Sequence, residues 1–364
     1  MAESKDEFYM RKAIELAKKG EGWTNPNPMV GAVVVKDDRI IGQGYHEKYG
    51  QFHAERNALS NLTELAEGAT IYVTLEPCCH YGKTPPCTEA IIENKIGRVV
   101  IGSRDPNPKV AGKGARILRE AGIQVEEDFL REECDKLNKV FFHYITTKTP
   151  YVVMKYAMTL DGKIATKTGA SKWITGETAR NQVHKLRHRY MGIMAGIGTV
   201  LADDPMLNTR IEGKKSPIRI ICDSSLRIPL HSNICKTAKE YRTIVAHAES
   251  NVEKINALES IGVETIYCPD NTGRVDLCKL MQALGEKGID SILLEGGATL
   301  NYSALSQGIV NKAMVYVAPK IFGGEESKTA VSGEGVELPS QAFSMKLDSV
   351  ERIGEDLLLE YEMR

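Results

Sequence analysis

The chain has 364 residues and a mass of 40.2 kDa, and at roughly 100–200 residues per domain this length predicts two domains. Hydrophobic residues make up 42% of the sequence and charged residues 26%, which is typical of a globular protein and excludes a disordered, collagenous or coiled-coil chain. The net charge of −1 argues against a protein that binds nucleic acid through a broad basic surface, because such binding depends on neutralising phosphates.

The sequence contains no apolar run of the roughly 20 residues that are needed to cross a bilayer. Its N-terminus, MAESKDEFYMRKA, contains acids and lacks the apolar core of a signal peptide. The eight cysteines are few for this length, and three of them lie within residues 78–87. We therefore expect a cytoplasmic protein with a metal or redox cluster near residue 80, and with neither nucleic acid nor membrane as a partner.

Strand-like and helix-like segments alternate along the chain, which predicts an α/β fold. The first helix should begin after Ser4, which forms a capping box with Glu7, and should end near Gly20. The next expected elements are strands at 30–35 and 40–44, a helix at 53–65, a strand at 70–75, a helix at 87–96, a strand at 98–103 and a helix at 112–122.

The segment Thr146–Pro150 is the best candidate for a linker, because it follows a helical stretch ending in FFHYI and precedes a new strand, YVVMKYAM. It predicts one domain at 1–146 and a second at 151–364. The second part has its own series of strand-like segments, at 219–223, 243–248, 291–297 and 313–319. Its cysteines and histidines have no metal-ligand spacing, so the two parts should do different work.

One group of residues in the first part has the character of a zinc site. The sequence H-A-E at His53–Glu55 is followed by P-C ending at Cys78 and, after an eight-residue gap, by Cys87. One imidazole and two thiolates suit Zn²⁺ and leave a fourth position for water, whose pKa the metal lowers from about 15.7 towards about 7. Glu55 diverges from His53 on a helix and can carry a proton from water to substrate. H-x-E with a following P-C-x-x-C is the signature of zinc nucleobase deaminases.

The wide gap between the two cysteines leaves alternatives open. Cys79 and His80 are rival ligands, and a closed structural zinc site that includes Cys79 is the main alternative. Against that site, adjacent cysteines rarely both reach one ion, and Glu55 would have no task. Two other functions are a zinc deaminase of nucleosides or tRNA with a nucleic-acid-binding second domain, and a non-catalytic zinc-stabilised assembly module. The absence of a basic and aromatic stretch argues against the first, and Glu55 argues against the second.

The segments TNPNPMVGAVVV, HAERNAL and TLEPCCHYGKTPPC closely resemble the N-terminal domain of the bifunctional riboflavin-biosynthesis deaminase–reductase family. The longer gap between the cysteines is that family's own pattern. The family usually has Ser where this chain has Cys79, so the resemblance implies that Cys79 is not a ligand. The likeness continues through the second domain and covers nearly the whole chain.

In the second part, KYAMTLDGKIA, SKWITG, GIGTVLADDP and EGGATLN carry the resemblance. Gly196 and Gly198 begin a dinucleotide-binding pattern, but Leu201 stands where that pattern needs Gly or Ala, and tight turns explain the glycines equally well. The resemblance decides between these interpretations, since it implies a reductase domain that uses NADPH. The predicted architecture is a cytidine-deaminase-like α/β/α domain with one zinc, followed by a dihydrofolate-reductase-like α/β domain.

The resemblance also implies roles for residues by position. The expected dinucleotide contacts are Ala157, Trp173, Thr199, Asp203, Ser224 and Gly297. The expected substrate contacts of the second domain are Ser171, Arg187, Leu207, Arg210 and Glu295, with Lys155 near the reacting carbon. The expected substrate contacts of the first domain are Asn27, His46, Lys83, Asp105 and Asn107. The two arginines suit a phosphorylated substrate, whereas Asp105 with the following Pro fits a plain turn equally well.

The implied reaction has two consecutive steps. Hydrolysis removes the exocyclic amine of 2,5-diamino-6-ribosylamino-4(3H)-pyrimidinone 5′-phosphate and releases ammonia. NADPH then reduces the ribosyl group to the ribityl side chain of 5-amino-6-(5-phospho-ribitylamino)uracil. We also expect the chain to form a homo-oligomer.

Overall fold

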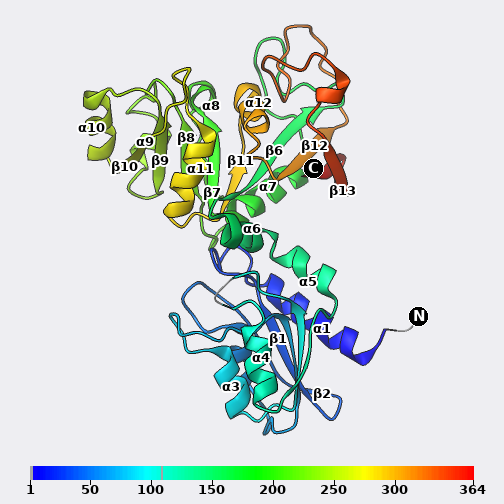
Figure 1. Cartoon of the computed structure of the whole chain (residues 1–364). Helices are drawn as coiled ribbons and strands as arrows, with labels where there is room; N and C mark the ends of the chain where they lie inside the picture. The colour runs from blue at the N-terminus through cyan, green and yellow to red at the C-terminus, as the bar shows by residue number, and fades with distance from the viewer. Residues whose placement is uncertain (1–2, 108–109) are drawn as a thin grey trace. The chain divides into compact units, whose positions relative to one another are not determined.

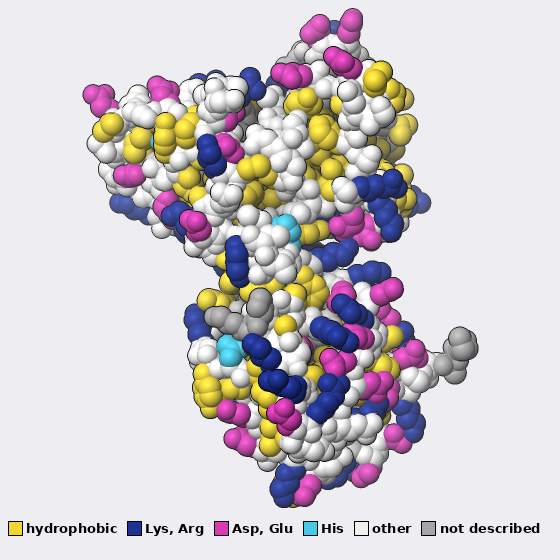
Figure 2. Space-filling view, in the orientation of Figure 1, with side chains coloured by type: hydrophobic (Ala, Val, Ile, Leu, Met, Phe, Trp, Pro, Cys, Tyr) yellow, Lys and Arg dark blue, Asp and Glu magenta, His cyan; other side chains and the backbone are white. Residues whose placement is uncertain are grey.

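The computed structural model describes residues 3–107 and 110–364, which form two compact units that divide after Lys148 (Figure 1). None of the helices in these two ranges combines the length and the apolar character that crossing a membrane requires. On the visible face of each unit, Lys and Arg side chains are interspersed with Asp and Glu (Figure 2).

The first unit is built on a five-stranded mixed sheet with the order β2-β1-β3-β4-β5. Strand β1 (Gly31–Lys36) pairs antiparallel with both β2 (Arg39–Tyr45) and β3 (Thr70–Leu75). Strands β4 (Arg98–Ser103) and β5 (Gln124–Glu126) continue the sheet in parallel with β3.

Helices cover both faces of this sheet. They are α1 (Lys5–Lys18), α2 (Ala54–Ser60), α3 (Cys87–Glu93), α4 (Lys113–Glu120), α5 (Arg131–Leu137) and α6 (Lys139–Thr147). Ala32 and Val34 of β1 belong to an apolar cluster with α2, α3 and α4, whereas Val33 and Val35 pack with α1 and α5. Because successive strand residues face opposite sides, this alternation gives an α/β/α sandwich with two cores.

The second unit contains a nine-stranded sheet with the order β10-β9-β8-β7-β11-β6-β12-β14-β13. The strands from β10 to β12 in this order are parallel, and β14 and β13 continue them antiparallel. Their bounds are β6 (Tyr151–Thr159), β7 (Gly192–Gly196), β8 (Ile218–Cys222), β9 (Thr243–His247), β10 (Val263–Tyr267), β11 (Ser291–Leu294), β12 (Lys312–Ala318), β13 (Met345–Ile353) and β14 (Asp356–Met363). Strand β11 therefore lies between β7 and β6, which precede it in the sequence.

The helices of the second unit are α7 (Glu177–Arg189), α8 (Ile197–Asp203), α9 (Asn233–Lys236), α10 (Val252–Ser260), α11 (Leu277–Glu286) and α12 (Ala298–Ser306), with a 3₁₀ helix at Pro339–Gln341. Met194 and Ile220 pack with α11 and α12 on one face of the sheet. Ile193 and Ile221 pack with α8, α9 and α10 on the other face. Both units thus confirm the predicted α/β class.

The local predictions hold where short-range chemistry decides the structure. Ser4 Oγ accepts from the Glu7 amide at 3.2 Å, and Glu7 Oε2 accepts from the Ser4 amide at 2.8 Å, so the capping box is formed. The predicted helix at 53–65 is wrong at its end, because α2 stops at Ser60. The Thr63 amide donates to Ile41 O at 2.8 Å, which draws the chain onto β2 instead of into another helical turn.

Candidate active sites

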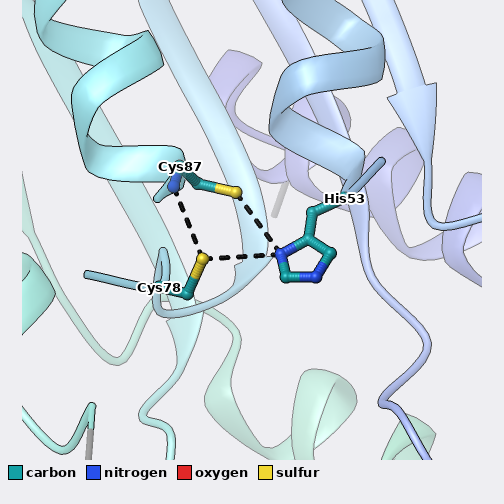
Figure 3. Close-up of side chains that lie close together, drawn as sticks. All are labelled: His53, Cys78 and Cys87. Carbon is teal, nitrogen blue, oxygen red and sulfur yellow. Dashed lines mark hydrogen bonds between the residues drawn. The ribbon is translucent and has the colours of Figure 1, made fainter. Parts of the chain in front are cut away.

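The predicted zinc ligands of the first unit lie together. His53 Nδ1 is 3.5 Å from the Sγ atoms of both Cys78 and Cys87 (Figure 3). His53 is the N-cap of α2, Cys78 follows the end of β3, and Cys87 is the first residue of α3. The Cys87 amide donates to Cys78 O at 3.0 Å and approaches Cys78 Sγ at 3.4 Å. Elements that are distant in sequence thereby hold three ligand atoms within 4.8 Å of one another.

The donor set fits a zinc ion. The hydrogen bond from Cys87 and the adjacent His53 lower the pKa of the Cys78 thiol, and the same pair contact raises the pKa of Cys87. The Cys78 thiol therefore ionises readily without a metal. A bound cation would stabilise the thiolate of Cys87 as well. Cys79 is not part of the cluster among the described residues, and burial raises the pKa of its thiol.

Glu55 lies beside this cluster and is buried, with 3% of its surface exposed. It occupies the first turn of α2, and its carboxyl group and the Cys87 thiol are close enough to shift each other's pKa. Burial and the neighbouring Cys78 raise the pKa of Glu55 to about 7. A carboxyl group with a pKa near neutrality is suited both to accept and to return a proton.

A cavity of about 320 Å³ opens next to the cluster and is lined by His53, Glu55 and Cys78. It is also lined by all five residues that the resemblance predicts as substrate contacts in this unit, namely Asn27, His46, Lys83, Asp105 and Asn107.

The histidine in this cavity wall has a defined hydrogen-bond arrangement. His46 Nδ1 faces Phe52 O at 3.0 Å and must donate to it, while Asn27 Nδ2 lies 3.2 Å from His46 Nε2. Burial lowers the pKa of His46, so the neutral ring accepts the Asn27 amide hydrogen at Nε2. The amide oxygen of Asn27 is thereby oriented by a fixed partner.

Asp105 and Lys83 occupy other parts of the wall. The Asp105 carboxylate accepts from the Asn107 amide at 2.8 Å, which is the turn considered as an alternative for this segment. Burial raises the pKa of Asp105 to about 6. Lys83 Nζ lies 4.0 Å from the ring centroid of Tyr49, another cavity-lining residue.

Sequence reasoning missed two residues that support the zinc ligands. The buried Glu76 carboxylate accepts from the amides of Gly112, Gly114 and Ala115 at 2.9, 3.0 and 3.3 Å, and so joins the end of β3 to the start of α4. A Cβ at Gly114 would lie 2.2 Å from Pro77 O, so this approach requires glycine. Arg56 contacts the loop between the two cysteines. The contacts of Arg56 and of Glu76 each join residues about 30 or more positions apart, so no local sequence pattern predicts them.

In the second unit, three predicted residues form a buried charged cluster. Glu295 follows β11, Lys155 lies on β6, and Arg187 lies on α7. Arg187 donates to Glu295 from Nε at 2.7 Å and from Nη2 at 3.1 Å, and Lys155 Nζ is 3.6 Å from Glu295 Oε2. Side-chain exposure is 13–16% for all three residues, so water screens these charges only weakly.

The cluster sets the ionisation of its members. Burial alone would raise the pKa of Glu295, but Arg187 and Lys155 together lower it to about 2. Burial lowers the pKa of Lys155, and the Glu295 carboxylate opposes that effect. Glu295 is therefore ionised at neutral pH, and Lys155 gives up its proton more readily than an exposed lysine does.

Several predicted dinucleotide contacts lie at the carboxyl ends of the parallel strands. Thr199 and Asp203 are on α8 directly after β7, Ser224 follows β8, and Gly297 is the N-cap of α12 after β11. A Cβ at Gly297 would lie 4.0 Å from Thr199 Oγ1, so these two positions are neighbours. Ligands of parallel α/β sheets bind at this edge, where the strand order reverses, and β11 inserted between β7 and β6 marks such a reversal.

The remaining predicted contacts lie on β6 or on loops. Ala157 and Ser171 are half-buried. Trp173 is 58% exposed, and the Arg180 guanidinium stacks on its ring at 4.6 Å. Leu207 is buried and Arg210 is exposed on the loop after α8.

A hydrogen bond joins this loop to the buried cluster. Arg187 Nη1 donates to Asn208 O at 3.1 Å. The loop that carries Leu207 and Arg210 is thereby fixed close to the Glu295 side chain.

The family models that match the chain cover both units. Residues 3–103 match the cytidine and deoxycytidylate deaminase zinc-binding region, and residues 150–359 match the RibD C-terminal domain. The riboflavin biosynthesis protein RibD of Actinobacillus pleuropneumoniae is 58% identical over 353 residues, which are 97% of this chain and 94% of that protein. RibD of Escherichia coli is 39% identical over 368 residues, with 97% and 98% of the two chains covered.

Solved structures resemble the chain over its whole length. One crystal form of Acinetobacter baumannii RibD has a TM-score of 0.89 at 39% identity, with 99% of each chain covered. A Thermotoga maritima protein described as a diaminohydroxyphosphoribosylaminopyrimidine deaminase/5-amino-6-(5-phosphoribosylamino)uracil reductase has a TM-score of 0.89 at 40% identity and the same coverage.

Proposed function

The chain belongs to the RibD family of riboflavin-biosynthesis proteins, and from this we infer that it carries out two consecutive steps, a deamination followed by a reduction. The first step is hydrolytic deamination of 2,5-diamino-6-ribosylamino-4(3H)-pyrimidinone 5′-phosphate. The second is NADPH-dependent reduction of the ribosyl group, which gives 5-amino-6-(5-phospho-ribitylamino)uracil. The observation that carries this proposal is a zinc-type ligand set with a buried acid at a cavity in one unit, and a buried Lys–Arg–Glu cluster in the other.

We assign deamination to residues 1–146, with zinc held by His53, Cys78 and Cys87. Zinc, when bound, supplies a Lewis acid that makes water a better nucleophile near neutral pH. Glu55 takes one proton from the attacking water and delivers it to the ring nitrogen. It then takes the second proton from the newly formed hydroxyl group and delivers it to the departing amine. The C–N bond breaks, a carbonyl forms, and ammonia leaves. The raised pKa of Glu55 suits both proton transfers.

The cavity wall binds and orients the pyrimidine in this proposal. Asn27, held by His46, presents an amide oxygen to the ring, and Asp105 and Asn107 contact polar groups of the substrate. Lys83 lies in the loop between Cys78 and Cys87 and supplies a positive charge for the substrate phosphate.

We assign reduction to residues 151–364. NADPH, when bound, supplies the hydride. The proposed dinucleotide contacts are Ala157, Trp173, Thr199, Asp203, Ser224 and Gly297. The proposed substrate contacts are Ser171, Arg187, Leu207, Arg210 and Glu295. The Lys155 ammonium group lies 3.6 Å from Glu295 Oε2, which orients it. It stabilises and protonates the sugar oxygen that is released as the reacting carbon is reduced.

We also propose that the chain works as a homo-oligomer in the cytoplasm. Strand β13 is at the edge of its sheet, and its seven inner residues are all exposed. Leu347 and Val350 on this strand are 51% and 56% exposed, and an unpaired edge strand offers its backbone to a second copy. If this is the interface, Val350→Asp should shift the mass measured by light scattering to that of a monomer. All eight cysteines are free thiols, which suits a reducing compartment.

Incubation with the diaminopyrimidinone phosphate followed by mass analysis tests the function. Without NADPH, the deaminated ribosyl compound should accumulate together with ammonia, and with NADPH the ribityl compound should form. Unchanged substrate in both reactions, together with deamination of free nucleosides or tRNA, would instead support a nucleoside or tRNA deaminase.

A further inference from the structure

We propose that Arg56 is a positioning residue for the metal site, because it ties the loop between the two cysteine ligands to the helix that carries His53. Arg56 lies on α2, one position after Glu55. Its Nε donates to Pro85 O at 3.0 Å, and its Nη2 donates to Pro86 O at 2.7 Å. The inference rests on the proposed zinc site and adds to it a residue that does not touch the metal.

The two hydrogen bonds end next to a ligand. Pro86 is the N-cap of α3 and Cys87 is the first residue of that helix, which has no side-chain cap. Pro85 and Pro86 have no amide hydrogens, so their carbonyl groups are the polar contacts that their backbone can make. A displacement of Pro86 would move Cys87 directly.

The ties around the site are complementary. The Cys87 amide donates to Cys78 O at 3.0 Å, which fixes the two cysteines relative to each other. That contact does not fix the distance from either cysteine to His53. His53 lies at the start of a separate helix (Figure 3). Arg56 supplies the missing connection, since it joins α2 to the residues immediately before Cys87.

The chemistry of the side chain matters for this role. A guanidinium group is planar and presents adjacent donors in a fixed fork, which suits two consecutive carbonyl oxygens. Lysine places a single ammonium group on a flexible chain and cannot fix both carbonyls in the same way. Glutamine retains part of the length and loses the charge and the fork.

Two residues provide matched controls. Tyr81, in the same loop, donates to the Glu89 carboxylate at 2.8 and 2.9 Å, which ties the loop to α3 but not to α2. Tyr81→Phe therefore removes a loop contact without touching the link to His53. Arg116→Gln removes an exposed guanidinium from α4 of the same unit.

The experiment measures the metal itself. Full-length protein loaded with zinc is mixed with an excess of a chromophoric chelator, and the rate of zinc transfer is followed for each variant. Arg56→Gln should release zinc about 10–100-fold faster than the starting protein, and Arg56→Lys should lie between the two. Tyr81→Phe and Arg116→Gln should release zinc at the original rate. Reduction of the pre-deaminated substrate should be unchanged in all variants, because the second unit is not altered. Cooperative unfolding in denaturant, followed by Trp23 fluorescence in a Trp173→Phe background, shows separately that the first unit of each variant is folded.

The outcomes separate this inference from the proposal on which it rests. If the starting protein binds no zinc, the proposed metal site is wrong. If it binds zinc and both Arg56 variants release it at the original rate, the metal site stands and the role of Arg56 is wrong. A cobalt-substituted Arg56→Lys protein provides a second readout, because displacement of Cys87 should change the thiolate-to-cobalt absorption, and an unchanged spectrum would also count against the inference.

Discussion

Arg187 and Glu295 engage each other through two hydrogen bonds, from Nε at 2.7 Å and from Nη2 at 3.1 Å. The third guanidinium nitrogen donates to Asn208 O. All three nitrogens of Arg187 are thus occupied before any substrate binds. Arg210, which is exposed on the adjacent loop, is therefore the better candidate to pair with the substrate phosphate. Arg187 and Glu295 would contact the substrate as a rigid pair beside Lys155.

This pair predicts acid sensitivity of the second unit. Burial opposes ionisation of Glu295, but Arg187 and Lys155 lower its pKa to about 2 in the folded protein, against 4.5 for an ordinary glutamate. Between these two pH values, the unfolded carboxyl group holds a proton that the folded one lacks. The stability contributed by Glu295 is therefore present above about pH 4.5 and is lost as the pH falls towards 2, with a total of roughly 3 kcal/mol.

The measurement is the denaturant midpoint of the second unit against pH, followed by Trp173 fluorescence in a Trp23→Phe background. Glu295→Gln should be less stable at neutral pH and should lose less stability on acidification. Glu355→Gln, at an exposed carboxyl group of the same unit, is the control. Equal slopes for Glu295→Gln and the starting protein would contradict the prediction.

The metal should be bound at about one zinc per chain by His53, Cys78 and Cys87. Elemental analysis of two variants distinguishes the neighbouring cysteines. Cys78→Ala should lose zinc because a ligand is removed, whereas Cys79→Ser should retain it because Cys79 is outside the cluster. Loss of zinc from the Cys79 variant would overturn the ligand assignment.

Glu55→Gln tests the proton carrier. The amide is similar in size to the carboxyl group but cannot accept and return a proton, so ammonia release should fall by at least ~10²-fold while zinc is retained. Zinc content and ammonia release are measured on the same preparation. Deamination near the original rate would refute the role of Glu55.

The two activities should be separable, because the proposed zinc ligands precede Lys148 and the proposed dinucleotide contacts follow Thr149. Removing the metal should stop ammonia release and spare reduction of the pre-deaminated substrate. Lys155→Ala should do the reverse, stopping NADPH oxidation so that the deaminated ribosyl compound accumulates. Each half-reaction is assayed with its own substrate, and loss of reduction on chelation with the fold intact would disprove two independent sites.

The parts of the molecule that sequence predicts best are those that short-range chemistry decides. The bounds of β3 agree with the predicted strand at 70–75, because the run TIYVTL, made mostly of β-branched and aromatic residues, is followed by Glu76 and Pro77. The candidate zinc ligands could be named for a related reason, since H-x-E at His53–Glu55 and P-C ending at Cys78 are short motifs, followed after an eight-residue gap by Cys87. That these three residues hold zinc stays a prediction.

Other features depend on contacts that no local pattern encodes. Arg56 reaches Pro85 across 29 positions and Glu76 reaches Gly114 across 38, so neither role was predictable from its neighbours. Strand β13 was also missed, because its exposed residues lack the alternation of apolar and polar side chains that marks a half-buried strand. The insertion of β11 between two earlier strands is likewise a long-range property.

The position of β11 has a consequence for the order in which the protein becomes functional during synthesis. Strands β6 and β7 are joined through β11, which leaves the ribosome more than 90 residues after β7, so the second sheet stays divided until that late segment arrives. The first unit has all of its strands by Glu126 and is able to fold long before. A nascent or truncated chain that ends before Ser291 would therefore contain a complete deaminase fold attached to an open, aggregation-prone half-sheet.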